Sequence, residues 1–263
     1  MLPADGGSAF TNYDPQIVDL FGQLRDACQR CEDADEAQAQ QMLSWVERFQ
    51  NWCYGRAVDQ YHREGRQYVT QMWERFDELY SAYATNVQPH AEVGIDLHAV
   101  YAGTWQPVAQ ALSPIVADVE ARRQQTHWKG RSAGEYMGQL PVQASALQEF
   151  GTFLRVGGAG VETPALIQQG IFVTVVAFLE GTRNQVRAYA GAEVGTSSFF
   201  QRSRAAAEYL TGRVAAFRSD IVDGKVWRPA LDSHIAQMTA PGVASPSVLT
   251  TDTWPTATTR GTV

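Results

Sequence analysis

The stretch THWKGRSAGEY, residues 126–136, admits two interpretations that lead to different folds. A Trp-X-Gly triplet at residues 128–130 is typical of a turn between two helices. A Gly-X-Ser-X-Gly pattern at residues 130–134 is typical of the nucleophile elbow of a serine hydrolase. The residues on either side of the stretch decide between them.

The surroundings of Ser132 argue against the hydrolase. A nucleophile elbow requires a strand directly before the serine and a sheet that carries the rest of the triad. The preceding residues 116–128, VADVEARRQQTHW, are polar and have helical spacing. The one run with strong β character, IFVTVVAFL at residues 171–179, lies in helical surroundings. With no triad, carboxylate pair or metal cluster in view, we predict a protein that is not an enzyme and needs no cofactor.

The hairpin has support on both sides of the turn. Gly130 can adopt a positive φ and reverse the chain. Ser132 and Glu135 have the spacing of a capping box for the next helix. We therefore predict a helix–turn–helix hairpin, in which Trp128 packs across the corner or anchors a partner.

The N-terminal region has the pattern of long helices. Asp14 followed by Pro15 is a typical helix start. The acidic residues 32–36, EDADE, are expected to separate this helix from a second one over residues 36–86, where no proline intervenes. A helix of that length would extend about 70 Å at 1.5 Å per residue, which is typical of elongated bundles.

The same criteria divide the chain into four regions. We expect a flexible arm over residues 1–13 and a helical hairpin with one very long helix over residues 14–86. A WXG-like helical bundle should cover residues 95–224, and a disordered tail residues 239–263. Within the bundle, the glycine-rich residues 156–164, VGGAGVETP, are expected to break the helix. The predicted fold class is all-α, an elongated antiparallel helical bundle.

Composition narrows the classes of partner. The 263 residues carry a formal charge of −7, and an acidic protein is a poor ligand for nucleic acid. The N-terminus has no pattern of a Sec signal peptide. The apolar run at residues 171–179 is far shorter than the roughly 20 residues that a membrane-spanning helix needs.

The cysteines form a C-X-X-C pair, Cys28 and Cys31, with Cys53 further along. Residues at positions i and i+3 are neighbours on a helix, so the pair is expected to be two small apolar side chains on one face. A zinc site would need a second Cys/His pair at motif spacing, and the five histidines are scattered. No metal site is predicted.

Two motifs together resemble a known family. The first is Trp128-Lys129-Gly130, followed by Ser132-Ala133 and Tyr136, between two amphipathic helices. The second is Tyr-X-X-X-Glu at residues 189–193. Over residues 106–195 the chain resembles the WXG family of type VII (ESX) secretion substrates and their longer actinobacterial relatives. The two motifs lie further apart here than in the small members, and the N-terminal 85 residues fall outside a minimal hairpin.

The resemblance implies roles for five residues. Trp128, Gly130 and Tyr136 would form the hairpin turn and contact a partner. Tyr189 and Glu193 would act as the export signal, although their four-residue spacing also fits an ordinary pair at the end of a helix.

The resemblance also implies a function. The protein would be exported by, or associated with, a type VII system and would act as a structural or effector subunit through helix–helix association. Its partners would be the secretion machinery and another protein or a second copy. It would be cytoplasmic before export, and secreted or at the cell surface afterwards.

Two alternatives stay open. The apolar residues 170–179, with small residues nearby, also suit a membrane-active or pore-building protein. The long helices and the tail also suit a subunit of a self-assembling filament, shell or phage-type structure. Membrane contact is therefore an alternative to the main prediction.

Overall fold

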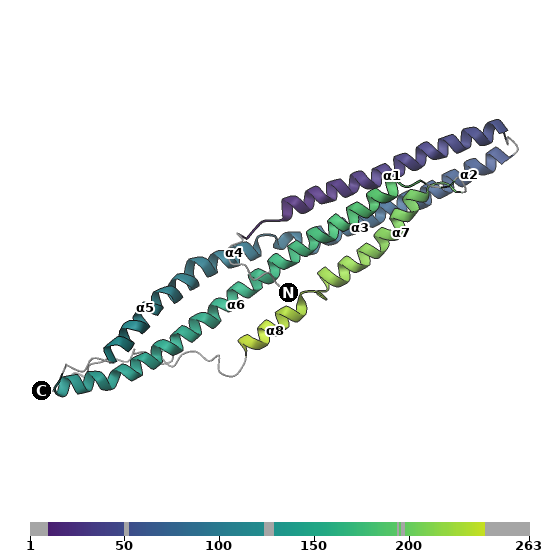
Figure 1. Cartoon of the computed structure of the whole chain (residues 1–263). Helices are drawn as coiled ribbons and strands as arrows, with labels where there is room; N and C mark the ends of the chain where they lie inside the picture. The colour runs from purple at the N-terminus through teal and green to yellow at the C-terminus, as the bar shows by residue number, and fades with distance from the viewer. Residues whose placement is uncertain (1–9, 50–52, 124–128, 194, 196–197, 240–263) are drawn as a thin grey trace. The chain divides into compact units, whose positions relative to one another are not determined.

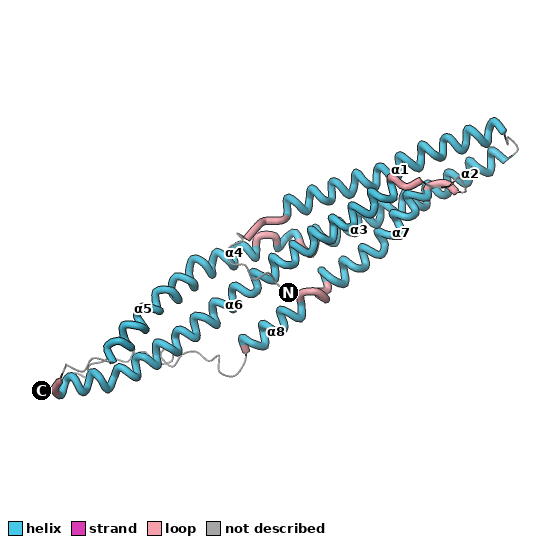
Figure 2. Tube along the Cα trace, in the orientation of Figure 1, coloured by secondary structure: helices cyan, strands magenta, loops and turns pink. Residues whose placement is uncertain are grey.

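The computed structural model describes residues 10–49, 53–123, 129–193, 195 and 198–239. All regular secondary structure in this part of the chain is helical, which confirms the predicted all-α class (Figure 2). The chain divides into two compact units. Unit 1 combines the residues up to Glu92 with Gln168–Pro229, and unit 2 combines Val93–Ile167 with the residues from Ala230 onward. The predicted arm and tail lie largely outside the described residues.

Unit 1 combines two segments that lie far apart in the sequence. Its α-helices, labelled in Figure 1, are α1 (Asp14–Phe49), α2 (Tyr54–Glu64), α3 (Thr70–Asn86), the last part of α6 (Arg131–Ala190) and α7 (Gln201–Phe217). It also contains the π-helical turns η2 (Gly65–Val69) and η5 (Arg218–Val222) and the short η3 (Gln88–His90). Since α6 also supplies residues to unit 2, the region expected as one bundle over residues 95–224 is divided between the two units.

The N-terminal helix begins as predicted but ends elsewhere. α1 starts at Asp14 and runs through the acidic residues 32–36 to Phe49, so these residues do not separate two helices. Glutamate and alanine are good helix formers, and the helix continues through both the exposed side chains of Asp33 and Glu36 and the buried one of Asp35. The expected single helix over residues 36–86 is also wrong. The described chain resumes at Cys53, enters helix α2 at Tyr54 and reaches α3 through η2.

The core of unit 1 contains one apolar face from each of four helices. The largest fully buried side chains on these faces include Ile17 and Leu24 of α1, Met72, Leu79 and Tyr83 of α3, Val175, Leu179 and Val186 of α6, and Leu210 and Phe217 of α7. Spacings of three, four and seven residues place each set on one side of its helix. The four faces therefore form a single apolar cluster.

The apolar run at residues 171–179 belongs to this core. Phe172, Val175 and Leu179 are buried there at helical spacing, whereas Val173 is 47% exposed. By length and composition alone, α6 is the one described helix that contains a segment apolar enough to cross a membrane, and a third of that segment is buried inside the protein.

Unit 2 has a smaller core. It contains α4 (Val93–Val100), the π-helical turn η4 (Tyr101–Trp105), α5 (Gln106–Arg123), the first part of α6 and most of α8 (Arg228–Met238). Leu112 of α5 packs with Leu147 and Leu154 of α6, and Trp105 and Phe150 lie against them. α5 and the first part of α6 therefore share one apolar seam.

The glycine-rich residues 156–164 do not break the helix, contrary to the prediction. They lie inside α6, as does Pro164 at their end. A Cβ atom on Gly157 would come within 2.4 Å of the Trp105 ring, and one on Gly158 within 3.2 Å of the Tyr101 ring. The glycines therefore admit aromatic rings against the α6 backbone, and this tertiary packing offsets their poor helix propensity of about 1 kcal/mol each.

Candidate functional site

The predicted hairpin turn precedes α6. Trp128 lies outside the described residues, so its packing stays a prediction. Gly130 has a φ of +113°, in the region that favours glycine. α6 then begins at Arg131, which pairs with Glu135 at 3.1 Å. Because Ser132 is already inside the helix, the predicted capping box is wrong.

Tyr136 connects the beginning of α6 with the end of α5. Its half-buried side chain accepts a long hydrogen bond of 3.5 Å from Arg122 Nη1. Arg122 also pairs with Asp118, one turn earlier on α5, at 2.7 Å. Tyr136 thus contacts α5 within unit 2, and its contact with a partner stays a prediction.

The predicted export signal lies at the other end of α6, in unit 1. The half-buried ring of Tyr189 packs on the core and meets the Tyr209 ring edge-to-face, with centroids 6.0 Å apart. α6 ends at Ala190, so Glu193 does not share a helix face with Tyr189. Glu193 is exposed in the segment that connects α6 to α7. The structure thus packs the Tyr189 ring on the core of unit 1 and leaves the Glu193 side chain exposed to solvent.

Arg213 supports the ring against which Tyr189 packs. Its guanidinium lies 3.5 Å from the centroid of the Phe178 ring and 5.9 Å from that of Tyr209. Arg213 Nε donates to Thr182 Oγ1 at 2.9 Å, and Nη2 donates to the Phe178 carbonyl at 3.1 Å. These contacts attach α7 to α6 at Phe178 and Thr182, which precede Tyr189 by eleven and seven residues.

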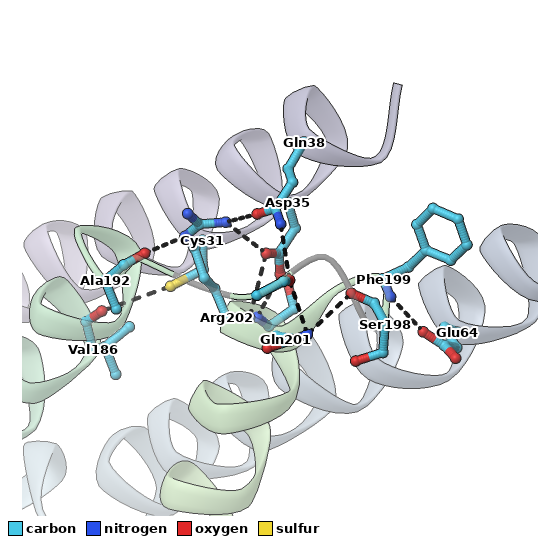
Figure 3. Close-up of polar contacts among 12 residues, drawn as sticks. Cys31, Asp35, Gln38, Glu64, Val186, Ala192, Ser198, Phe199, Gln201 and Arg202 are labelled. Atoms are coloured by element: carbon cyan, nitrogen blue, oxygen red, sulfur yellow. Dashed lines mark hydrogen bonds and ion pairs between the residues drawn. The ribbon is translucent and has the colours of Figure 1, made fainter. Parts of the chain in front are cut away.

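The connection after Tyr189 is held by a second arginine, Arg202, in the first turn of α7 (Figure 3). Arg202 Nε donates to the carbonyl of Ala192 at 3.1 Å. Its Nη1 donates to Gln38 Oε1 at 2.7 Å and to Asp35 Oδ1 at 3.2 Å, both on α1. Arg202 therefore bridges α1 and the residue directly before Glu193.

Asp35 supplies the N-terminal cap that α7 does not have in its own sequence. α7 follows Phe200, which has a left-handed φ of 53° and makes no side-chain cap. Asp35 Oδ2 accepts from the Ser203 N–H at 2.7 Å, and Oδ1 accepts from the Arg202 N–H at 3.3 Å. The Asp35 side chain is only 1% exposed. Backbone donors and a guanidinium thus compensate the burial of this charge.

Further contacts hold the rest of the connection. Gln38 of α1 and Gln201 of α7 each donate to the carbonyl of Gly195 at 3.2 Å. Glu64 of α2 accepts from the Phe199 N–H at 2.9 Å (Figure 3). Three helices thus bind the segment on both sides of Glu193 through its backbone, which leaves the Glu193 side chain accessible.

Phe199 and Phe200 fix the end of the connection through a small aromatic cluster. Both rings are buried and pack against Tyr61 of α2 at centroid distances of 5.8 and 5.4 Å. A Cβ atom on Gly65, in η2, would lie 3.0 Å from the Phe200 ring. The glycine therefore allows the phenylalanine to approach the backbone of η2.

The C-X-X-C pair lies beside this site, but both of its side chains belong to the buried core. As predicted, Cys28 and Cys31 lie on one buried face of α1. Cys31 Sγ donates weakly to the carbonyl of Val186 at 3.6 Å. Burial raises the pKa of each thiol from 9.0 to about 12, so both are protonated at neutral pH and are poor nucleophiles.

The sequence interpretation missed Asp35 and Arg202. One signal was available, because Asp35 follows Cys31 by four residues and continues the apolar face of α1. A carboxylate on an apolar face requires a buried partner. The identity of that partner was not available locally, since Arg202 lies 167 residues further along the chain.

Comparison with models of known protein families, with curated proteins and with solved structures found no match to the chain.

Proposed function

We propose that the protein is a non-enzymatic helical subunit that a type VII (ESX-like) secretion system exports or binds, and that it acts through helix–helix association. Such a protein would be cytoplasmic before export, and secreted or at the cell surface afterwards. The observation that carries the proposal is the connection around Glu193. Three helices bind backbone atoms of this connection, the Glu193 side chain is exposed, and Tyr189 lies four residues before Glu193.

This arrangement suits recognition by another protein. Backbone groups that neighbouring helices already bind, such as those of Ala192 and Gly195, lose little conformational entropy when a partner binds. The positive φ of Gly130 is compatible with the WXG-like turn, which forms the second half of the proposal. The two motifs belong to different compact units, so each is expected to make its own contact with the secretion machinery.

Export from a host with a type VII system tests the proposal. Glu193→Ala changes an exposed side chain, so we expect it to abolish export while leaving helix content and melting temperature unchanged. Glu180→Ala, at another exposed glutamate near the end of α6, is the matched control and should be exported normally. Normal export of the Glu193 variant would contradict the proposed signal.

The turn is tested separately. We expect the double variant Trp128→Ala, Gly130→Ala to lose export or partner binding while helix content is retained. Secretion of this variant at the wild-type level would remove the WXG-like turn from the proposal.

The alternative, a membrane-active protein, is supported only by the length and composition of α6. The burial of Phe172, Val175 and Leu179 in the core of unit 1 means that insertion of this segment would require unit 1 to open. Leakage of dye from anionic liposomes at micromolar protein would favour this alternative over the main proposal.

A further inference from the structure

A groove lies between α1 and α3 in unit 1. Its volume is about 500 Å³, and its walls are two rows of side chains at spacings of three and four residues: Val18, Gly22 and Arg25 on α1, and Trp73, Asp77 and Tyr80 on α3. Each row is therefore one face of its helix. Phe21 lies beneath, with its ring centroid 5.1 Å from that of Tyr80.

The groove has the form that accepts another helix. Two rows of side chains on neighbouring helices leave a channel into which the ridge of a third helix packs. Gly22 opens the middle of the channel, since a Cβ atom there would have nothing within 4 Å. Val18 and Tyr80 are 42% and 41% exposed, so the edges of the channel are uncovered apolar surface.

Unit 2 carries an exposed apolar face that matches such a groove. Val93, Val100, Val108 and Ile115 are 42%, 49%, 43% and 51% exposed. Their spacings of seven, eight and seven residues keep them on one side of the helix, because the eight-residue step crosses η4 and a π-helical turn takes up one extra residue. We call these four residues the α4–α5 stripe. β-branched side chains are stiff, so they lose little freedom in a contact.

Charges at the two surfaces are complementary. Arg25 on α1 and Asp77 on α3 stand exposed on opposite walls of the groove. Asp118 and Arg122 follow Ile115 on α5, and their side chains are 58% and 50% exposed. When the α4–α5 stripe lies in the groove, Asp118 can lie beside Arg25, and Arg122 can lie beside Asp77. Such rim pairs mainly set register and specificity.

We infer that the α4–α5 stripe of one molecule binds the α1–α3 groove of a second copy of this chain. The inference deepens the helix–helix association in the proposed function and rests on it for its biological setting. The two surfaces differ, so the contact is heterologous: each molecule uses its groove for one neighbour and its stripe for another. Repetition of this contact produces chains or rings.

The mass of the purified full-length protein in solution, measured by sedimentation velocity at increasing concentration, tests the inference. Wild-type protein should reach masses above that of one chain. Gly22→Leu places a side chain in the groove at a position where a Cβ atom has nothing within 4 Å, and Val108→Glu, Ile115→Glu charges the stripe. Each variant alone should remain a single chain, with association at least tenfold weaker. Gly55→Leu on α2 and Val142→Glu on α6, both at exposed positions, are matched controls that should associate normally.

A mixture of the two blocked variants gives the sharpest result. The Gly22 variant keeps its stripe and the stripe variant keeps its groove, so an equimolar mixture should form a dimer that neither forms alone. The charge arrangement predicts a second rescue, in which Asp118→Arg restores the association that Arg25→Glu weakens.

Three results would overturn the inference: a wild-type protein that stays a single chain at every concentration, blocked variants that associate like wild type, or a mixture that stays monomeric. These measurements need no secretion system. A failure of association can therefore be distinguished from a failure of export.

Discussion

Asp35 Oδ2 and the backbone nitrogen of Ser203 are 168 residues apart in the sequence and 2.7 Å apart in the fold. A carboxylate on α1 therefore caps the first turn of α7, a role that a local side chain usually performs. Because Arg202 binds the same carboxylate and also the carbonyl of Ala192, this cap fixes the connection that carries Glu193.

Loss of the cap should destabilise unit 1. We expect Asp35→Ala to lower the free energy of unfolding by about 3 kcal/mol, because it leaves a largely buried guanidinium and the N–H groups of α7 without their acceptor. Urea denaturation followed by circular dichroism measures this change. Glu36→Ala, at the neighbouring exposed position, should change stability by less than about 0.5 kcal/mol. Equal effects of both variants would show that the cap contributes nothing.

Gly157 should tolerate no side chain. We expect Gly157→Ala to lower stability by about 1–3 kcal/mol, because its methyl group would overlap the Trp105 ring. Gly138→Ala, in the same helix, meets no atom and should raise stability by up to about 1 kcal/mol through helix propensity. Thermal unfolding compares the two variants. A stabilised Gly157 variant would refute the close packing.

The hydroxyl of Tyr83 donates to Asp14 at the start of α1. Tyr83→Phe should therefore lower the free energy of unfolding by about 1–2 kcal/mol, since the carboxylate loses its buried donor. Tyr80→Phe on the same helix, where the side chain is 41% exposed, is the matched control and should be nearly neutral. Chemical denaturation of both variants tests the difference.

The thiols should differ in reactivity. Cys28 and Cys31 are buried and Cys53 is half-buried, so Ellman's reagent at pH 8 should modify Cys53 first. The other two should react only after unfolding. Mass spectrometry of the partly modified protein identifies the site. Rapid modification of Cys28 or Cys31 in the native protein would contradict their burial.

The same thiols predict the response to alkali. Burial raises the pKa of Cys28 and Cys31 to about 12 in the folded protein, against 9.0 for an ordinary thiol. Above pH 9 the unfolded chain loses protons that the folded chain keeps, so the free energy of unfolding should fall as pH rises from 9 towards 12. In the double variant Cys28→Ala, Cys31→Ala this fall should be shallower. Parallel curves for both proteins would refute the contribution of these thiols.

The features of the fold that were predictable from sequence are those that local chemistry decides. The helix start at Asp14 follows from Pro15, since a proline is favoured in the first turn of a helix. The burial of Phe172, Val175 and Leu179 follows from their three- and four-residue spacing. These patterns act within one or two helical turns, so one sequence is enough to find them.

The errors have a common physical cause in contacts between distant residues. Gly157 and Gly158 stay helical where aromatic rings from η4 pack on them, and Gly160 faces Met238. Asp35 looked like part of an acidic separator because Arg202 and Ser203, which bind it, come much later in the chain. No local rule contains the identity of such partners.

The discontinuous sequence of unit 1 has a consequence for biosynthesis. A ribosome releases the chain from its N-terminus, so α1 and α3 emerge long before α7, and the whole of residues 93–167 emerges in between. Until α7 leaves the exit tunnel, the nascent chain holds an exposed apolar surface on α1 and α3 and an Asp35 carboxylate without its ligands. The N-terminal helices must therefore wait for the second segment of unit 1, Gln168–Pro229, before they reach their native environment.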